Sequence, residues 1–396
     1  MKTAVIESQT PAGEGALRSN VELQRAYDLC VRKTRGNIKR LADEPKSAAW
    51  AVDGNYFAHP EGFNDIGNWT SSFLTGMAVI AWRETEDEYF RQQLLRLAPA
   101  YRDKAFTPKF HSHHDMGFLY SLYSVALYKL TGDQQHREVG LAAAEALYQR
   151  FNPKGNFIRA WGTLGTDEQE NMAIIDCMMN LPLLYWATIE SGDPKFRDAA
   201  IKQADTTSKY FIRPDDSVFH AFRFDLKTGQ PIGGDNYCGR ATDSHWARGT
   251  GWAIYGFALS YRYTGDKKYL DAALRVARKF NKELNGDALP VWDFKLPVGE
   301  ALLRDSSAAA VVVCGYQELE KLGVADVLIT KTKESLLGSL CTDEYLNFDA
   351  ACPGILKDGQ VGNNGPGSAQ NAYMTWGDYF LMEALDRELH NSETWW

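Results

Sequence analysis

Strongly apolar stretches alternate with amphipathic ones along most of this chain. In three places an apolar stretch ends at a turn containing Gly-Asp, and a segment with one polar face follows. These turns are Thr131-Gly132-Asp133, Ser191-Gly192-Asp193 and Thr264-Gly265-Asp266. Glycine readily adopts the left-handed conformation that ends a helix, and aspartate caps the first turn of the next helix. The pattern predicts helical hairpins that recur about every 60–70 residues, as an internal repeat.

Further segments extend this series toward both ends of the chain. Residues 77–82 and 311–322 are weaker copies of the apolar helix, residues 21–41 predict an amphipathic helix, and residues 375–389 predict a closing one. A helix that is apolar all round is buried, whereas an amphipathic helix faces water on one side. About six inner and six outer helices therefore predict an all-α fold, an (α/α)6 toroid of six helical hairpins. We expect strands only near residues 156–160 and 218–224.

The bulk composition narrows the domain organisation and the partners. The 396 residues are 44% hydrophobic, which suits one large core. We expect a flexible segment over residues 1–20 and a single catalytic domain over residues 21–396. The net charge of -8, without a basic run, argues against nucleic acid and anionic membranes as partners. Without an apolar run of membrane-spanning length or a visible signal peptide, we expect a cytoplasmic protein, either a monomer or a weak dimer.

The six cysteines give no sign of a metal or redox site. No two of them have C-x-x-C spacing, so we expect reduced and mostly buried thiols and no cofactor. The Gly249-Thr-Gly251 segment has no strand before it, which argues against a nucleotide site.

In a toroid all the inner helices begin at the same end, so the segments that precede them gather around one cleft. Those segments supply aromatic, acidic and basic side chains: Asn68-Trp69, His113-His114-Asp115, Asp176, Ser244-His245-Trp246-Ala247-Arg248, Arg304-Asp305-Ser306, Tyr373 and Trp376. The helix N-termini add partial positive charge, which favours an anionic ligand.

Asp176 is a single carboxylate within the apolar residues 173–181. A carboxylate on a buried surface loses hydration, and this favours the protonated form that a general acid needs. The alternative role is a helix cap.

Asp115 is a second acid, and the imidazoles of the adjacent His113 and His114 could bond substrate hydroxyls. The alternative roles of Asp115 are a helix cap or, together with His111, a ligand in a metal site. Two carboxylates at one cleft are the minimal equipment for glycoside chemistry.

Arg248 and three tryptophans complete the candidate site. Arg248 could bind a carboxylate or sulfate through two parallel hydrogen bonds, or it could form a structural ion pair. Trp69, Trp246 and Trp252 could stack on a sugar or simply pack in the core.

Eight short blocks carry a family resemblance. They are Gly67-Asn-Trp-Thr, His114-Asp115-Met-Gly-Phe, Phe157-Ile-Arg159-Ala-Trp161, Ile174-Ile-Asp176-Cys-Met-Met-Asn, Trp246-Ala-Arg248-Gly, Trp292-Asp-Phe, Arg304-Asp-Ser-Ser-Ala-Ala and Thr375-Trp-Gly-Asp378-Tyr. With these blocks in this order, the chain resembles the unsaturated glucuronyl hydrolases of glycoside hydrolase family 88. The resemblance implies an (α/α)6 barrel that removes 4,5-unsaturated glucuronic acid from the non-reducing end of lyase-generated oligosaccharides.

The resemblance also implies residue roles. Asp176 would protonate C4 of the double bond and activate the water that attacks C5, and Asp115 would assist at the ring hydroxyls. His220 and Arg248 match positions that contact substrate in the family. Trp69 and Trp252 match stacking positions.

The chain departs from the family pattern at Cys238 and Thr250, where the family commonly has Gln. We expect residues 353–370, with Lys357, to discriminate between leaving groups. Three alternatives stay open: an unsaturated rhamnogalacturonyl hydrolase, another toroidal enzyme such as an inverting glycosidase or epimerase, and a catalytically silent sugar-binding protein.

Overall fold

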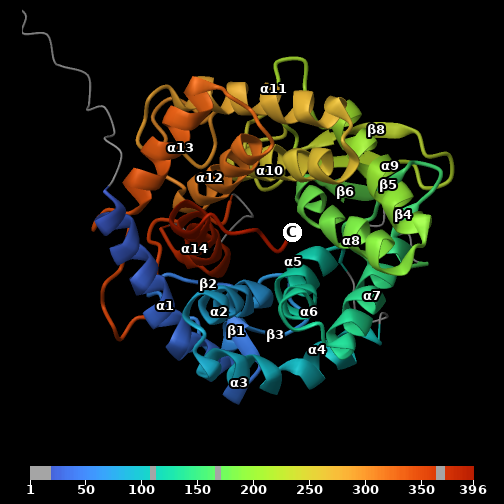
Figure 1. The fold of residues 1–396 in the computed structure, drawn as a ribbon. Coiled ribbons are helices and arrows are strands. Elements are labelled where there is room, and N and C mark those ends of the chain that lie inside the picture. Colours follow the sequence, from blue (N-terminus) through green and yellow to red (C-terminus); the bar gives the residue numbers. More distant parts are fainter. Residues whose placement is uncertain (1–18, 108–112, 166–170, 363–370) are drawn as a thin grey trace, which may run out of the picture.

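The computed structural model describes residues 19–107, 113–165, 171–362 and 371–396. Its helices form two concentric rings (Figure 1). The inner ring consists of α2 (Ser71–Thr85), α5 (Met116–Tyr120) with the π-helical η3 (Ser121–Val125) and α6 (Ala126–Thr131), α8 (Leu181–Ser191), α10 (Ala247–Thr264), α12 (Ser306–Lys321) and α14 (Thr375–His390). The outer ring consists of α1 (Asn20–Asp43), α3 (Glu88–Arg96), α4 (Ala98–Ala105), α7 (Gln134–Gln149), α9 (Pro194–Tyr210), α11 (Lys267–Leu284) and α13 (Val327–Leu340).

The turns between inner and outer helices have the predicted chemistry. The three predicted glycines adopt φ angles of 71° at Gly132, 75° at Gly192 and 68° at Gly265. The aspartate that follows each glycine accepts a hydrogen bond from the backbone N–H two residues later, as an N-cap does. In these three hairpins the inner helix ends and the outer helix begins at the predicted turn.

Burial separates the two rings. Residues 247–260 of α10 and 306–319 of α12 are buried throughout, whereas α11 buries only one face. This confirms the prediction of an all-α toroid with buried inner helices and solvated outer ones. The predicted flexible segment lies, but for its last two residues, outside the described residues; α1 begins after the N-cap Ser19. None of the described helices has the length and apolarity needed to span a membrane.

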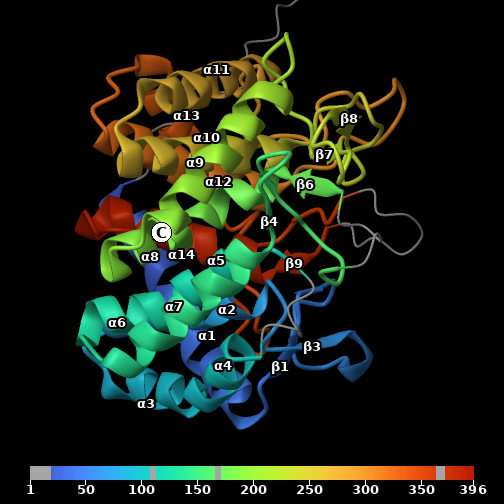
Figure 2. The same ribbon diagram turned by 90° about the vertical axis from the view of Figure 1, so that its right-hand side faces the viewer.

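The described residues contain more strands than predicted, although every strand is short. They are β1 (Lys46–Ala48), β2 (Trp50–Ala51), β3 (Phe63–Asp65), β4 (Phe151–Asn152), β5 (Phe157–Ile158), β6 (Met172–Ile174), β7 (Ala221–Phe224), β8 (Pro231–Asp235) and β9 (Tyr373–Met374). They pair antiparallel as β1-β3, β2-β9, β4-β5 and β6-β7-β8. Figure 2 shows that the strands gather toward one end of the barrel. Two of them, β5 and β7, confirm the predicted strand positions.

Aromatic rings fill the axis of the inner ring. The Phe118 ring centroid lies 5.7 Å from that of Trp69 on one side and 5.7 Å from that of Trp396 on the other. Trp396 stacks on Phe380 at 6.0 Å, and its indole N–H donates a 2.9 Å hydrogen bond to Glu383. The C-terminal residues lie at the centre of the ring (Figure 1), so they close the end of the barrel that lies away from the strands (Figure 2).

Candidate active site

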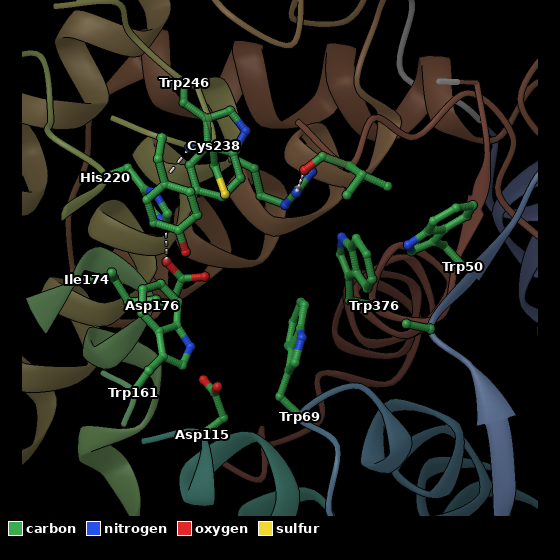
Figure 3. A pocket seen from close by; sticks show the side chains of 14 residues that line it. Trp50, Trp69, Asp115, Trp161, Ile174, Asp176, His220, Cys238, Trp246 and Trp376 are labelled. Carbon is green, nitrogen blue, oxygen red and sulfur yellow. Dashed lines mark hydrogen bonds and ion pairs between the residues drawn. The ribbon is translucent and has the colours of Figure 1, made fainter. Parts of the chain in front are cut away.

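A cavity of about 210 Å³ opens where the inner helices begin. Its walls differ in chemistry (Figure 3): Asp176, His220, Trp161 and Trp246 lie on one side, and Trp50, Trp69 and Trp376 lie on the other. The complete lining consists of Ala49, Trp50, Trp69, Asp115, Trp161, Ile174, Asp176, His220, Tyr237, Cys238, Trp246, Arg248, Val361 and Trp376. Carboxylates therefore face a set of indole rings across a space of about the size of a sugar ring.

Asp176 reaches this cavity from a strand-to-helix junction. β6 ends at Ile174, and the 3-10 helix η4 (Ile175–Met179) follows. Asp176 makes no capping bond there, and its Oδ2 has no hydrogen-bond partner among the described residues. The side chain is only 13% exposed. The helix-cap alternative is therefore wrong, and a largely desolvated carboxylate faces the cavity.

His220 is the ion-pair partner of Asp176 in the cavity wall. Its Nε2 lies 3.5 Å from Asp176 Oδ2, and its ring packs against Tyr237 at 4.3 Å and Trp246 at 4.8 Å. Burial lowers the pKa of His220, but the Cys238 sulfur and the Asp176 carboxylate outweigh burial and raise that pKa to about 9. The Cys238 N–H donates to His220 Nδ1 at 3.4 Å, so the ring proton lies on Nε2, which faces Asp176.

Asp115 is the N-cap residue of α5, yet its side chain makes no capping bond. Its Oδ1 instead accepts a 3.2 Å hydrogen bond from the Asn180 amide, and its Oδ2 lies 3.4 Å from His113 Nδ1. Burial raises the pKa of Asp115, but the neighbouring imidazoles and the Asn180 bond offset burial and hold it below its usual range. Asp115 is therefore ionised at neutral pH.

His114 lies behind Asp115 rather than in the cavity. It is fully buried, its Nε2 lies 3.3 Å from Asp115 Oδ1, and burial lowers its pKa. A fully buried imidazole has no access to a substrate hydroxyl. The expectation that His114 binds substrate is therefore corrected: it supports Asp115 from the core.

Arg248 lies in the cavity wall with its donors engaged by the protein. Its Nη1 bonds Asp305 Oδ2 at 2.9 Å, and its Nη2 donates to the Val361 carbonyl at 2.8 Å. The guanidinium also lies 4.7 Å from the Trp246 ring centroid. The structural ion pair is thus present, and the Arg248 cation nevertheless borders the cavity.

The tryptophans divide into two groups. Trp69 lines the cavity with its ring centroid 5.0 Å from that of Trp376. Trp252 is fully buried between Phe118 and Phe380, at 5.4 and 5.3 Å, and it does not line the cavity. A ring with no exposed face cannot stack on a sugar, so the structure corrects the stacking role expected for Trp252 and places it in the core.

Two aromatic lining residues escaped the sequence reasoning. Trp50 lies in β2, which reaches the cavity because it pairs with β9 from the far end of the chain. Tyr237 follows β8, and burial together with the nearby Cys238 and Asp176 raises the pKa of its phenol, so the phenol keeps its proton. In the local sequence, each residue is marked only by its aromatic side chain, in a short strand for Trp50 and after one for Tyr237.

The two departures from the family pattern occupy different environments. Cys238 lines the cavity, whereas Thr250 is buried and its hydroxyl lies 2.8 Å from His245 Nε2. Only Cys238 therefore changes the cavity surface. Lys357 donates to the Asp343 carbonyl at 2.8 Å and is not a lining residue, and residues 363–370 lie outside the described part of the chain.

Potential metal ligands cluster elsewhere. Among the described residues, Glu84, Asp386 and His390 lie close enough together to share an ion, but the Arg83 guanidinium already pairs with both carboxylates. In the metal alternative at residues 111–115, His111 lies outside the described residues, and His113 Nε2 lies 2.9 Å from the Gly67 carbonyl. We therefore assign no metal to either group.

Comparison with known proteins fits this geometry. Residues 42–287 match the model of Glycosyl Hydrolase Family 88. The chain belongs to this family. The unsaturated glucuronyl hydrolase of Bacillus sp. strain GL1 is 35% identical over 372 residues, which cover 92% of this chain and 96% of that protein. The unsaturated chondroitin disaccharide hydrolase of Streptococcus pyogenes is 32% identical, covering 96% of this chain and 94% of that protein.

Solved structures agree on the fold. The crystal structure of the unsaturated glucuronyl hydrolase from Bacillus sp. GL1 superposes with a TM-score of 0.85 at 33% identity, covering 93% of this chain and 97% of that one. A mutant of the Streptococcus agalactiae enzyme, complexed with dGlcA-GalNAc6S, gives a TM-score of 0.81 at 27% identity, covering 96% and 95%. The chain is therefore a family 88 glycoside hydrolase with the helical barrel of these enzymes.

Proposed function

We propose that this enzyme removes 4,5-unsaturated glucuronic acid from the non-reducing end of lyase-generated oligosaccharides, with Asp176 as general acid and base and Asp115 assisting. The observation that carries the proposal is the placement of these two carboxylates in one indole-walled cavity, each with a different partner. Two relatives support this substrate class: one is an unsaturated glucuronyl hydrolase and the other is an unsaturated chondroitin disaccharide hydrolase.

The reaction is a hydration of the C4=C5 vinyl ether. Protonated Asp176 delivers its proton to C4, and the ring oxygen stabilises the positive charge that develops at C5. Water then adds to C5 as its second proton passes to the Asp176 carboxylate, which regenerates the acid. The resulting hemiketal opens and releases the glycan together with an open-chain keto-uronate.

The neighbours of Asp176 and Asp115 suit this sequence of steps. The Nε2 of His220, 3.5 Å from Asp176, can donate a hydrogen bond that holds the Asp176 carboxylate in place while it takes the proton from water. Asp115, which is ionised, can accept hydrogen bonds from the sugar hydroxyls and stabilise positive charge at C5. The indole rings of Trp69 and Trp376 offer apolar faces for the sugar.

The C4=C5 bond absorbs ultraviolet light, so its loss reports the reaction directly. The protein is incubated with unsaturated disaccharides made by lyases from hyaluronan, chondroitin, heparin, ulvan and pectin. We expect loss of absorbance with glucuronyl-terminated disaccharides. Loss with the pectin-derived substrate alone would favour the rhamnogalacturonyl alternative, and no loss with any substrate would refute the proposal.

Asp176→Asn tests the residue assignment. Removal of a positioned general acid lowers turnover by about 10²–10⁴-fold. Asp198→Asn is the matched control, because it makes the same chemical change on an exposed position of the outer helix α9. The assignment fails if the turnover of Asp176→Asn stays within about tenfold of the wild type, because a positioned general acid usually contributes more than that.

A further inference from the structure

The start of helix α5 is capped in an unusual way. An aspartate at the N-cap normally accepts a hydrogen bond from the backbone N–H two or three residues later. Asp115 holds that position without making the bond. The Phe118 N–H, three residues later, instead donates a 2.9 Å hydrogen bond to Asn180 Oδ1 from a distant part of the chain. Asn180 therefore performs the capping that Asp115 would otherwise perform.

The other end of the same amide contacts both acidic segments. Asn180 Nδ2 donates to Asp115 Oδ1 at 3.2 Å and to the backbone carbonyl of Asp176 at 3.3 Å. Asn180 is fully buried at the junction of η4 and α8, so no water competes for these bonds. One side chain thus fixes the Asp115 carboxylate relative to the turn that carries Asp176.

The approach of Asn180 to α5 depends on a glycine. A Cβ atom at Gly117 would lie 2.3 Å from Asn180 Cα and 2.8 Å from Asn180 Oδ1. Contacts this short would force the two segments apart, and the backbone of residue 180 cannot yield as a flexible side chain could. Gly117 therefore creates the space that lets the amide reach the Phe118 N–H.

We propose that Asn180 is a positioning residue that caps α5 in place of Asp115 and so leaves the Asp115 carboxylate free to face the cavity beside Asp176. The catalytic consequence of this arrangement rests on the function proposed above, whereas the capping consequence does not. The two parts are therefore tested by different measurements.

Asn180→Ala tests the catalytic part. Without the amide, the Asp115 carboxylate turns toward the vacant Phe118 N–H and withdraws from the substrate. Misplacement of a reacting group by about 1 Å can cost about 100-fold in rate. We expect kcat to fall about 10–100-fold, with KM changed much less, since the aromatic walls remain. Asn281→Ala is the control. It removes another buried amide, on the outer helix α11, whose Oδ1 accepts a hydrogen bond from Tyr316 of α12, and it should leave kcat unchanged.

Asn180→Asp separates positioning from simple loss of packing. This isosteric change keeps an acceptor for the Phe118 N–H, but it replaces the donor to Asp115 with a second carboxylate. Like charges at this distance raise the pKa of Asp115. The other titratable groups around Asp115 are His113, His114, Asp176, Cys177 and Tyr237, which the change leaves in place. We expect the acid limb of the kcat/KM profile to move to higher pH.

A crystal structure of Asn180→Ala tests the capping part without reference to activity. We expect an Asp115 carboxylate oxygen within hydrogen-bond distance of the Phe118 nitrogen. The proposal is overturned if the Asp115 side chain stays in its original place in this structure. It is also overturned if the wild type is active and both Asn180 variants keep its kcat. If the wild type is inactive on every disaccharide while Asp115 does move in the variant, the proposed function fails and the capping role stands.

Discussion

Acid should destabilise this protein through one buried histidine, His245, which precedes helix α10. His245 is fully buried, its Nε2 lies 2.8 Å from the Thr250 hydroxyl, and its Nδ1 has no hydrogen-bond partner among the described residues. Burial, with the nearby Arg213 and Lys279 cations, lowers its pKa from 6.5 to about 3. The imidazole is therefore neutral in the folded protein at neutral pH.

The sign and size of the effect follow from this depressed pKa. The unfolded chain binds a proton at His245 below pH 6.5, whereas the folded protein resists doing so until about pH 3. The contribution of neutral His245 to the free energy of unfolding is therefore fully present above pH 6.5 and is lost as the pH falls toward 3. Each pH unit in this window corresponds to about 1.4 kcal/mol, so the loss reaches about 2 kcal/mol at pH 5.

Urea unfolding of the wild type and of His245→Gln at pH 7.5 and 5.0 measures this contribution. Glutamine does not titrate, and it can keep the bond to Thr250. We expect the variant to be less stable at pH 7.5, with the difference in unfolding free energy narrowing by about 2 kcal/mol at pH 5.0. An unchanged difference would refute the reasoning. His59→Gln is the control, since Asp53 raises the pKa of this exposed imidazole and gives any effect the opposite sign.

Two further predictions concern contacts around the cavity. Arg248→Ala should raise KM for an anionic substrate and destabilise the fold by about 3–5 kcal/mol, because it leaves the buried Asp305 carboxylate without its cation. Adding Asp305→Asn, which removes the charge and keeps the oxygen that caps α12, should restore part of the thermal stability and none of the KM. Gly256→Ala would place a Cβ 2.3 Å from Met178 Cβ, so we expect a loss of about 1–3 kcal/mol and a lower kcat, because η4 carries Asp176. Gly36→Ala on α1 has no atom within 4 Å of its new Cβ and should be neutral or stabilising.

The barrel could be predicted because its signals are local. Gly132 and Asp133, and their counterparts in the other two turns, specify helix ends through their own backbone preferences, and the apolar inner helices need no partner to be recognised. Asp115 and Asp176 could be placed at one cleft because each precedes an inner helix. This inference needs only the topology of a toroid.

The missed features depend on contacts between distant segments. The two-residue strand β2 exists because it pairs with β9, so neither Trp50 nor its place in the cavity follows from local sequence. Trp252 and Trp69 look alike in sequence, and only the packing of Phe380 and Phe118 decides that Trp252 is covered. The capping of α5 by Asn180 requires two segments to meet at Gly117, which no local pattern specifies.

The aromatic column beneath the cavity determines how molecules travel through this enzyme. Because Phe118, Phe380 and Trp396 occupy the axis, the cavity is a dead end in the part of the chain that the structure describes, and its mouth serves as both entrance and exit. A polysaccharide cannot thread through such a barrel, so only a chain terminus reaches the carboxylates. In the proposed reaction the unsaturated sugar enters first, so the detached sugar is innermost and the remaining glycan stands between it and solvent. The glycan must therefore leave first, which makes its departure a candidate for the slowest step.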